Sequence, residues 1–89
     1  MKNTFYSNLL KCNVRQIDKR QARKLFYSDE RIFLHPSNLK FDNPWQTPMP
    51  LMRDLTWHKD FDTVLNDYMY YNCDSERGRY VHFFVAEKN

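Results

Sequence analysis

The sequence is poor in glycine and cysteine: its 89 residues include one glycine, Gly78, and two cysteines, Cys12 and Cys73. A single glycine excludes the glycine-rich loops that cradle nucleotide phosphates, and predicts only a turn from helix to strand at Gly78. Two cysteines cannot form the disulfide framework of small secreted domains, so free thiols in a reducing compartment are expected.

Long apolar runs are also missing. No stretch approaches the roughly 18 apolar residues of a membrane span, and the opening MKNTFYSNLLKCNV lacks the apolar core of a secretory signal. We therefore expect a cytoplasmic protein that does not insert into membranes.

Recognisable catalytic patterns are absent as well. The three histidines are widely separated, without the close spacing of metal ligands. Cys73 is followed by the acids Asp74 and Glu76, whereas a nucleophilic thiolate needs an electropositive setting. We predict no catalytic residue, no metal and no cofactor, and hence no enzyme.

The composition that remains is that of one small folded domain, residues 1–89. Hydrophobic residues make up 42% of the chain and aromatic residues 17%, whereas disordered chains are poor in aromatics. The formal net charge of +3 is mild: it permits an acidic partner without requiring one.

Apolar periodicity predicts six elements. They are a strand over residues 4–14, a helix over 19–27, a strand over 31–36, an edge strand near 45–52, a helix over 60–72 and a central strand over 79–86. Asp18 and Gln21 form the pattern of a capping box for the first helix. The order β-α-β-β-α-β is ferredoxin-like, which implies an α+β fold with a four-stranded antiparallel sheet and both helices on one face. The third strand is the weakest of the six, so another small α+β sheet stays open.

The last strand and the two helices supply the predicted core. Alternation places one set of residues of the last strand against the apolar faces of both helices. The residues concerned are Val81, Phe83 and Val85 on the strand and Leu25, Phe26, Val64, Leu65 and Tyr68 on the helices.

Two surfaces are candidates for binding a partner. The first is the basic start of the first helix, with Lys19, Arg20, Arg23 and Lys24, where positive charge opposes the helix dipole. The alternative is that these residues form only a solvated helix face. The second is the sheet face opposite the helices, where Phe33, His35, Tyr80, His82 and Phe84 would lie. If that face is open, its aromatics could stack on bases as in the RNA-recognition motif, although that family's glycine- and phenylalanine-rich signature is missing. The alternatives for this face are a dimer interface or a cover formed by the proline-rich segment.

The segments IFLHPSNLKFDNPW and DFDTVLNDYMYYNCDSERGRYVHFFV, together with the AxKLF pattern of the first helix, carry a resemblance. Over residues 17–85 the chain resembles small uncharacterised proteins of phages, plasmids and integrative elements. The resemblance implies a bacterial host and a binding role, because such proteins include inhibitors of host defences such as anti-CRISPR proteins. It assigns no role to any residue.

Our functional hypothesis is a non-catalytic protein that binds a nucleic acid or a host protein that handles nucleic acids. The alternative is a homo-oligomeric interaction module, such as a homodimer, that uses the aromatic sheet face.

Overall fold

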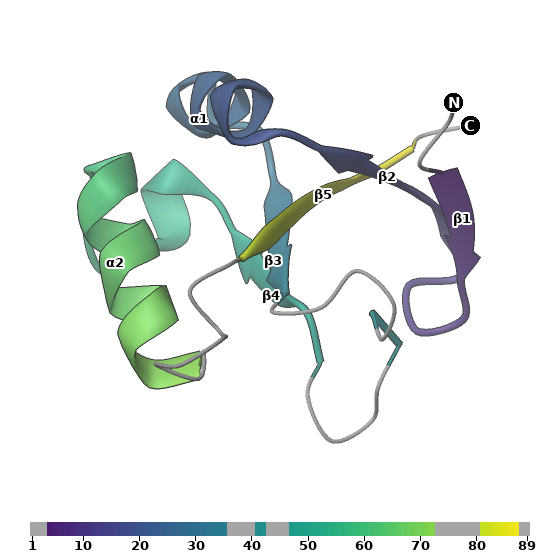
Figure 1. The fold of residues 1–89 in the computed structure, drawn as a ribbon. Helices are drawn as coiled ribbons and strands as arrows, with labels where there is room; N and C mark the ends of the chain where they lie inside the picture. The colour runs from purple at the N-terminus through teal and green to yellow at the C-terminus, as the bar shows by residue number, and fades with distance from the viewer. Residues whose placement is uncertain (1–3, 36–40, 43–46, 73–80, 88–89) are drawn as a thin grey trace.

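The computed structural model describes residues 4–35, 41–42, 47–72 and 81–87, and shows a small α+β domain (Figure 1). Its elements are β1 (Thr4–Ser7), β2 (Cys12–Ile17), α1 (Lys19–Tyr27), β3 (Ile32–His35), β4 (Met49–Leu51), the 3₁₀ turn η1 (Arg53–Leu55), α2 (Phe61–Asn72) and β5 (His82–Ala86). Gly78 lies outside the described residues.

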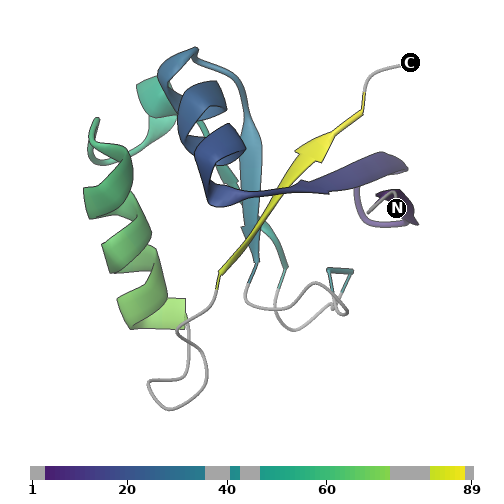
Figure 2. The same cartoon turned by 45° about the horizontal axis from the view of Figure 1, so that its top comes forward.

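The strands form one antiparallel sheet with the order β1-β2-β5-β3-β4. Both helices lie on the same side of this sheet (Figure 2). None of the helices in the described part of the chain is long and apolar enough to cross a membrane.

The prediction of one strand over residues 4–14 is wrong. The segment is a hairpin in which β1 pairs with β2 from Thr4 opposite Arg15 to Ser7 opposite Cys12. Between the strands, the Lys11 N–H donates to the Ser7 carbonyl at 2.7 Å, and Lys11 adopts a left-handed conformation with φ of 58°. The turn contains no glycine or proline, which are the usual sequence signals for such a break.

The extra strand changes the topology. The sheet has five strands rather than four, and β5 lies between β2 and β3. In a ferredoxin-like sheet the last strand lies at an edge, so that part of the prediction is wrong, whereas the α+β class and the central position of β5 are confirmed. The short β4 lies at the opposite edge from β1, as expected for the proline-rich segment.

The start of α1 follows the prediction closely. The backbone N–H of Gln21 donates to the Asp18 carboxylate at 2.8 Å, and the Gln21 side-chain oxygen accepts from the Asp18 N–H at 3.2 Å. This capping box satisfies two backbone donors at the helix end. Ile17, just before the cap, is buried in the same core as Ala22, an arrangement typical of a hydrophobic staple.

The core between the helices and the sheet is the predicted one. Phe83 of β5 is 5% exposed and packs in a cluster with Phe26 of α1 and Val64 of α2. The other residues predicted for this core also belong to the cluster or pack against it: Leu25, Leu65, Tyr68, Val81 and Val85. Tertiary packing here follows directly from the apolar alternation of β5 and the apolar faces of the helices.

Candidate functional site

The sheet face opposite the helices is covered rather than open. Phe33 is 6% exposed, and both His35 and Phe84 are 0% exposed. Phe41 lies over them and is itself buried. These three positions are therefore not open, and the structure here supports the alternative of a cover by the proline-rich segment, which contains Phe41. Tyr80 lies outside the described residues.

The cover is built from ring contacts. The Phe41 centroid lies 4.8 Å from that of Phe84 and 5.3 Å from that of Phe5 on β1, in edge-on geometry. It lies 6.3 Å from the Phe33 centroid and 5.9 Å from that of His35. Aromatic rings that pack edge to face stabilise one another beyond the area they bury. These side chains form a second small core and are not available to stack on bases in this conformation.

Asp42 anchors Phe41 to the β1–β2 hairpin. Its carboxylate accepts a 2.6 Å hydrogen bond from the Ser7 hydroxyl and a 2.9 Å bond from the Asn8 N–H. Partial burial raises the pKa of Asp42, but the hydrogen bonds from Ser7, Asn8 and Leu9 outweigh it and leave the pKa below its usual value. The same Ser7 hydroxyl accepts from the Leu10 N–H at 3.1 Å, so Asp42 and Ser7 together hold the turn.

His82 remains half-buried at one end of this face. It lies opposite His35 in the sheet, and its Nδ1 lies 3.2 Å from the Gln16 side-chain nitrogen. Burial, and to a smaller extent the neighbouring His35, lower the pKa of His82. A neutral imidazole is thus favoured at this position.

The basic helix is the predicted surface that the structure leaves accessible. Lys19, Arg20 and Lys24 are exposed on α1. None of the three forms an ion pair with any described residue. The first turn of α1 contains no acidic residue, so the Asp18 cap is the negative group closest in sequence. These three cations are called the α1 cation cluster below.

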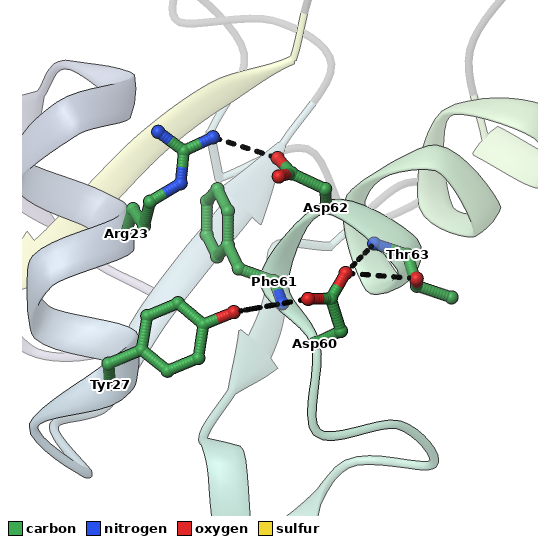
Figure 3. A network of polar contacts seen from close by, with 6 residues as sticks. All are labelled: Arg23, Tyr27, Asp60, Phe61, Asp62 and Thr63. Carbon is green, nitrogen blue, oxygen red and sulfur yellow. Dashed lines mark hydrogen bonds and ion pairs between the residues drawn. The ribbon is translucent and has the colours of Figure 1, made fainter.

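Arg23 has a different environment from the other three basic residues. It donates to the Asp62 carboxylate at 2.8 Å, and its guanidinium lies 5.3 Å from the centre of the Phe61 ring (Figure 3). Arg23 therefore joins α1 to the start of α2. The structure places it at the helix junction.

The same junction contains the N-terminal cap of α2 (Figure 3). One Asp60 carboxylate oxygen accepts from the Thr63 N–H at 3.1 Å and from the Thr63 hydroxyl at 3.0 Å. The Tyr27 hydroxyl accepts from the Phe61 N–H at 3.0 Å and donates to the other Asp60 oxygen at 3.4 Å. The Thr63 backbone bond is the main reason that the pKa of Asp60 lies below its usual value. This network joins the end of α1 to the start of α2.

Sequence reasoning missed a third surface, an apolar hollow of about 290 Å³ beside the edge strand β4. Its lining consists of Arg31, Pro50, Leu51, Met52, Leu55, Thr56 and Trp57. Leu55 is 75% exposed and Trp57 is 59% exposed. The only hint in the sequence is the clustering of large apolar side chains and prolines over residues 44–57, which does not reveal which of them stay in solvent.

The described residues include no group of three or more histidine, cysteine or acidic side chains that could hold a metal ion. Cys12 is a half-buried free thiol on β2, and Cys73 lies outside the described residues. The expectation that the protein is not an enzyme, and needs no cofactor, stays a prediction.

Comparison with known proteins gives no relative: no family model matches the chain, and neither a curated protein nor a solved structure shows a significant match.

Proposed function

We propose that this protein is a non-catalytic binding protein whose helix α1 contacts an acidic macromolecular partner. The observation that carries the proposal is the α1 cation cluster: Lys19, Arg20 and Lys24 are exposed and have no ion pair among the described residues. Arg23, on the same helix, is already paired with Asp62. A partner would therefore meet three available cations.

The electrostatic setting of the cluster supports this role. Lys19 and Arg20 occupy the first turn of α1, where the helix dipole disfavours positive charge by a few tenths of a kcal/mol per residue. An anionic group bound across the first turn would remove this unfavourable interaction. It would also interact favourably with the dipole.

The partner is either the phosphates of a nucleic acid or the acidic surface of a protein that handles nucleic acids. Three cations can make only a few phosphate contacts, so binding through them alone would be weak and independent of base sequence. The buried positions of Phe33 and Phe84 argue against base stacking as an additional source of affinity. The proposed biological setting is a mobile genetic element, where such binding would inhibit a host defence protein.

The structure does not favour the alternative, a homo-oligomer that forms through the aromatic face. That face is covered at Phe33, His35 and Phe84, and little of it is available to a second copy.

The test is a charge-matched pair of triple variants. Lys19→Gln, Arg20→Gln and Lys24→Gln neutralise the cluster, whereas Lys11→Gln, Arg15→Gln and Lys88→Gln remove three cations elsewhere in the sequence. Each set lowers the formal net charge from +3 by three, to zero. Binding to a 20-base-pair DNA duplex and to a 20-nucleotide single strand is measured over a salt series, alongside pull-downs from bacterial lysate with and without nuclease.

Phosphate binding predicts a log–log salt slope of about −0.9 per duplex phosphate contacted, or about −0.7 for a single strand. With three cations the duplex slope should be near −2.7, and it should vanish in the α1 variant but not in the control. An acidic protein partner predicts retention after nuclease treatment and slower association at high salt. Equal binding by both triple variants, to nucleic acid and in the pull-down, would refute the proposal.

A further inference from the structure

Large apolar side chains are exposed to solvent together at the hollow beside β4. Leu55 and Trp57 are more than half exposed, whereas most other large apolar residues of the described chain are buried or half-buried. The hollow also contains Pro50, Leu51 and Met52. Clustered exposed apolar groups of this kind mark interaction sites more often than isolated ones do.

The segment that carries Leu55 and Trp57 is braced in this shape by polar contacts. Arg53 donates to the Asp29 carboxylate at 3.0 Å, which joins η1 to the turn between α1 and β3. The Lys59 ammonium donates to the Arg53 carbonyl at 3.0 Å, and the Leu55 N–H donates to the Met52 carbonyl at 2.9 Å. The hollow is thus preformed, which lowers the entropy lost when a partner binds.

The orientation of the tryptophan is also fixed. The Trp57 indole N–H donates to the Asp67 carboxylate of α2 at 3.1 Å. The ring is 59% exposed and lines the hollow. Tryptophan and arginine are the side chains most enriched among residues that dominate binding energy.

Charge indicates the kind of partner. Arg31 is the one charged residue that lines this hollow, and it forms no ion pair with any described residue. Arg31 also lines the neighbouring hollow, together with the acids Asp29 and Glu30, of which Asp29 is already paired with Arg53. A guanidinium beside an apolar surface is suited to a carboxylate that binds through two parallel hydrogen bonds.

We infer that this hollow docks a segment of a partner protein that inserts a large apolar side chain beside an aspartate or glutamate. The volume of about 290 Å³ fits such a side-chain anchor, since pockets for drug-sized ligands are roughly 300–1,000 Å³. The site is separate from the α1 cation cluster and does not depend on the function proposed for it.

The test begins with a phage-displayed library of random dodecapeptides, selected on the wild-type protein and counter-selected on Leu55→Asp. Peptides that pair an acidic residue with a large apolar residue should be enriched. The binding of enriched peptides, made synthetically with a fluorescent label, is then followed by anisotropy. Arg31→Gln and Leu55→Ala should each weaken binding roughly tenfold, as expected for a central contact.

Two controls isolate the site. Tyr6→Ala removes another exposed aromatic, on β1, and should leave the affinity unchanged. The triple variant of the α1 cation cluster should also bind normally, so that failure of the proposed function and failure of this inference give different results. Leu55 is exposed, so its replacement should leave the melting temperature nearly unchanged.

Three results would overturn the inference: no enrichment over the Leu55→Asp counter-selection, enriched peptides without an acidic residue, or binding that is insensitive to Arg31→Gln. A wild-type dimer in sedimentation that becomes a monomer in Leu55→Asp would also overturn it, because the hollow would then belong to a contact between two copies.

Discussion

Phe41 packs edge to face on Phe84, with 4.8 Å between the ring centroids. The two residues come from the segment after β3 and from the central strand β5, so this contact closes the sheet face that the helices leave uncovered. The domain therefore has one core on each side of its sheet. The stability of the second core should depend on how firmly Phe41 is held.

Asp42→Ala should release that anchor. The Ser7 hydroxyl is buried and would lose its acceptor, so we expect the free energy of unfolding to fall by about 1–3 kcal/mol in urea denaturation. Asp54→Ala, which removes an exposed acid from η1, should change it by less than about 0.5 kcal/mol. Equal effects of the two substitutions would contradict a structural role for the Asp42–Ser7 bond.

Because Asp42 acts as a carboxylate, we expect the free energy of unfolding to depend on pH in the acidic range. The pKa of Asp42 in the folded protein lies below the usual value of 3.8, so its carboxylate stabilises the fold fully above that value and loses this contribution as the pH falls through the lower, folded pKa. The difference in stability between wild type and Asp42→Ala should therefore shrink as the pH is lowered below 3.8. A difference that stays constant from pH 7 to pH 2 would show that the charge is not involved.

Phe83→Ala tests the core beneath the helices. Phe83 is 5% exposed in the large cluster, and truncation should cost about 3–5 kcal/mol, which is a large part of the stability of a small domain. Tyr6→Ala, at a side chain that is 57% exposed, provides the aromatic control and should cost far less. Thermal melts that coincide for Phe83→Ala and wild type would exclude this core.

Tyr27→Phe tests the helix junction. The Tyr27 hydroxyl accepts from the Phe61 N–H at the start of α2, and its loss should cost about 0.5–1.5 kcal/mol. The matched control is Tyr6→Phe, since the Tyr6 hydroxyl has no hydrogen bond to a described residue, and this substitution should be neutral. Chemical denaturation of both variants gives the comparison, and a Tyr27→Phe protein as stable as wild type would show that water replaces the hydroxyl without loss.

His82 should make stability depend on pH in the mildly acidic range. Burial and His35 lower its pKa in the folded state below the usual 6.5, so the unfolded chain binds its proton more readily. Above pH 6.5, His82 is neutral in both states and does not reduce the free energy of unfolding. As the pH falls from 6.5 toward the folded pKa, the unfolded chain takes up the proton first and the free energy of unfolding decreases. Titration of the imidazole proton by NMR should give a midpoint below 6.5, and a midpoint at or above that value would contradict the structure.

The sequence predicts the elements that depend on local signals. The capping box at Asp18 and Gln21 predicts where α1 begins. The apolar residues on both sides of Phe83 predict that β5 is a central strand. Both patterns can be predicted because they act over a few residues. The hairpin was missed because Asp42, more than 30 residues away, stabilises a turn that lacks glycine and proline. The covered face and the hollow were not predictable for a related reason, since the burial of Phe41 and the exposure of Leu55 are decided by tertiary contacts.

The central position of β5 has a consequence for how the chain folds during synthesis. β5 is the last described strand, yet it pairs with both β2 and β3. Until residue 86 has left the ribosome, those two strands have no common neighbour and both cores lack their central phenylalanines, Phe83 and Phe84. The emerging chain can form α1 and the hairpin early, but the sheet must close in one late step that joins distant segments, and such steps are slow. We therefore expect the nascent protein to stay protease-sensitive until β5 has emerged, and then to become protected in a single step.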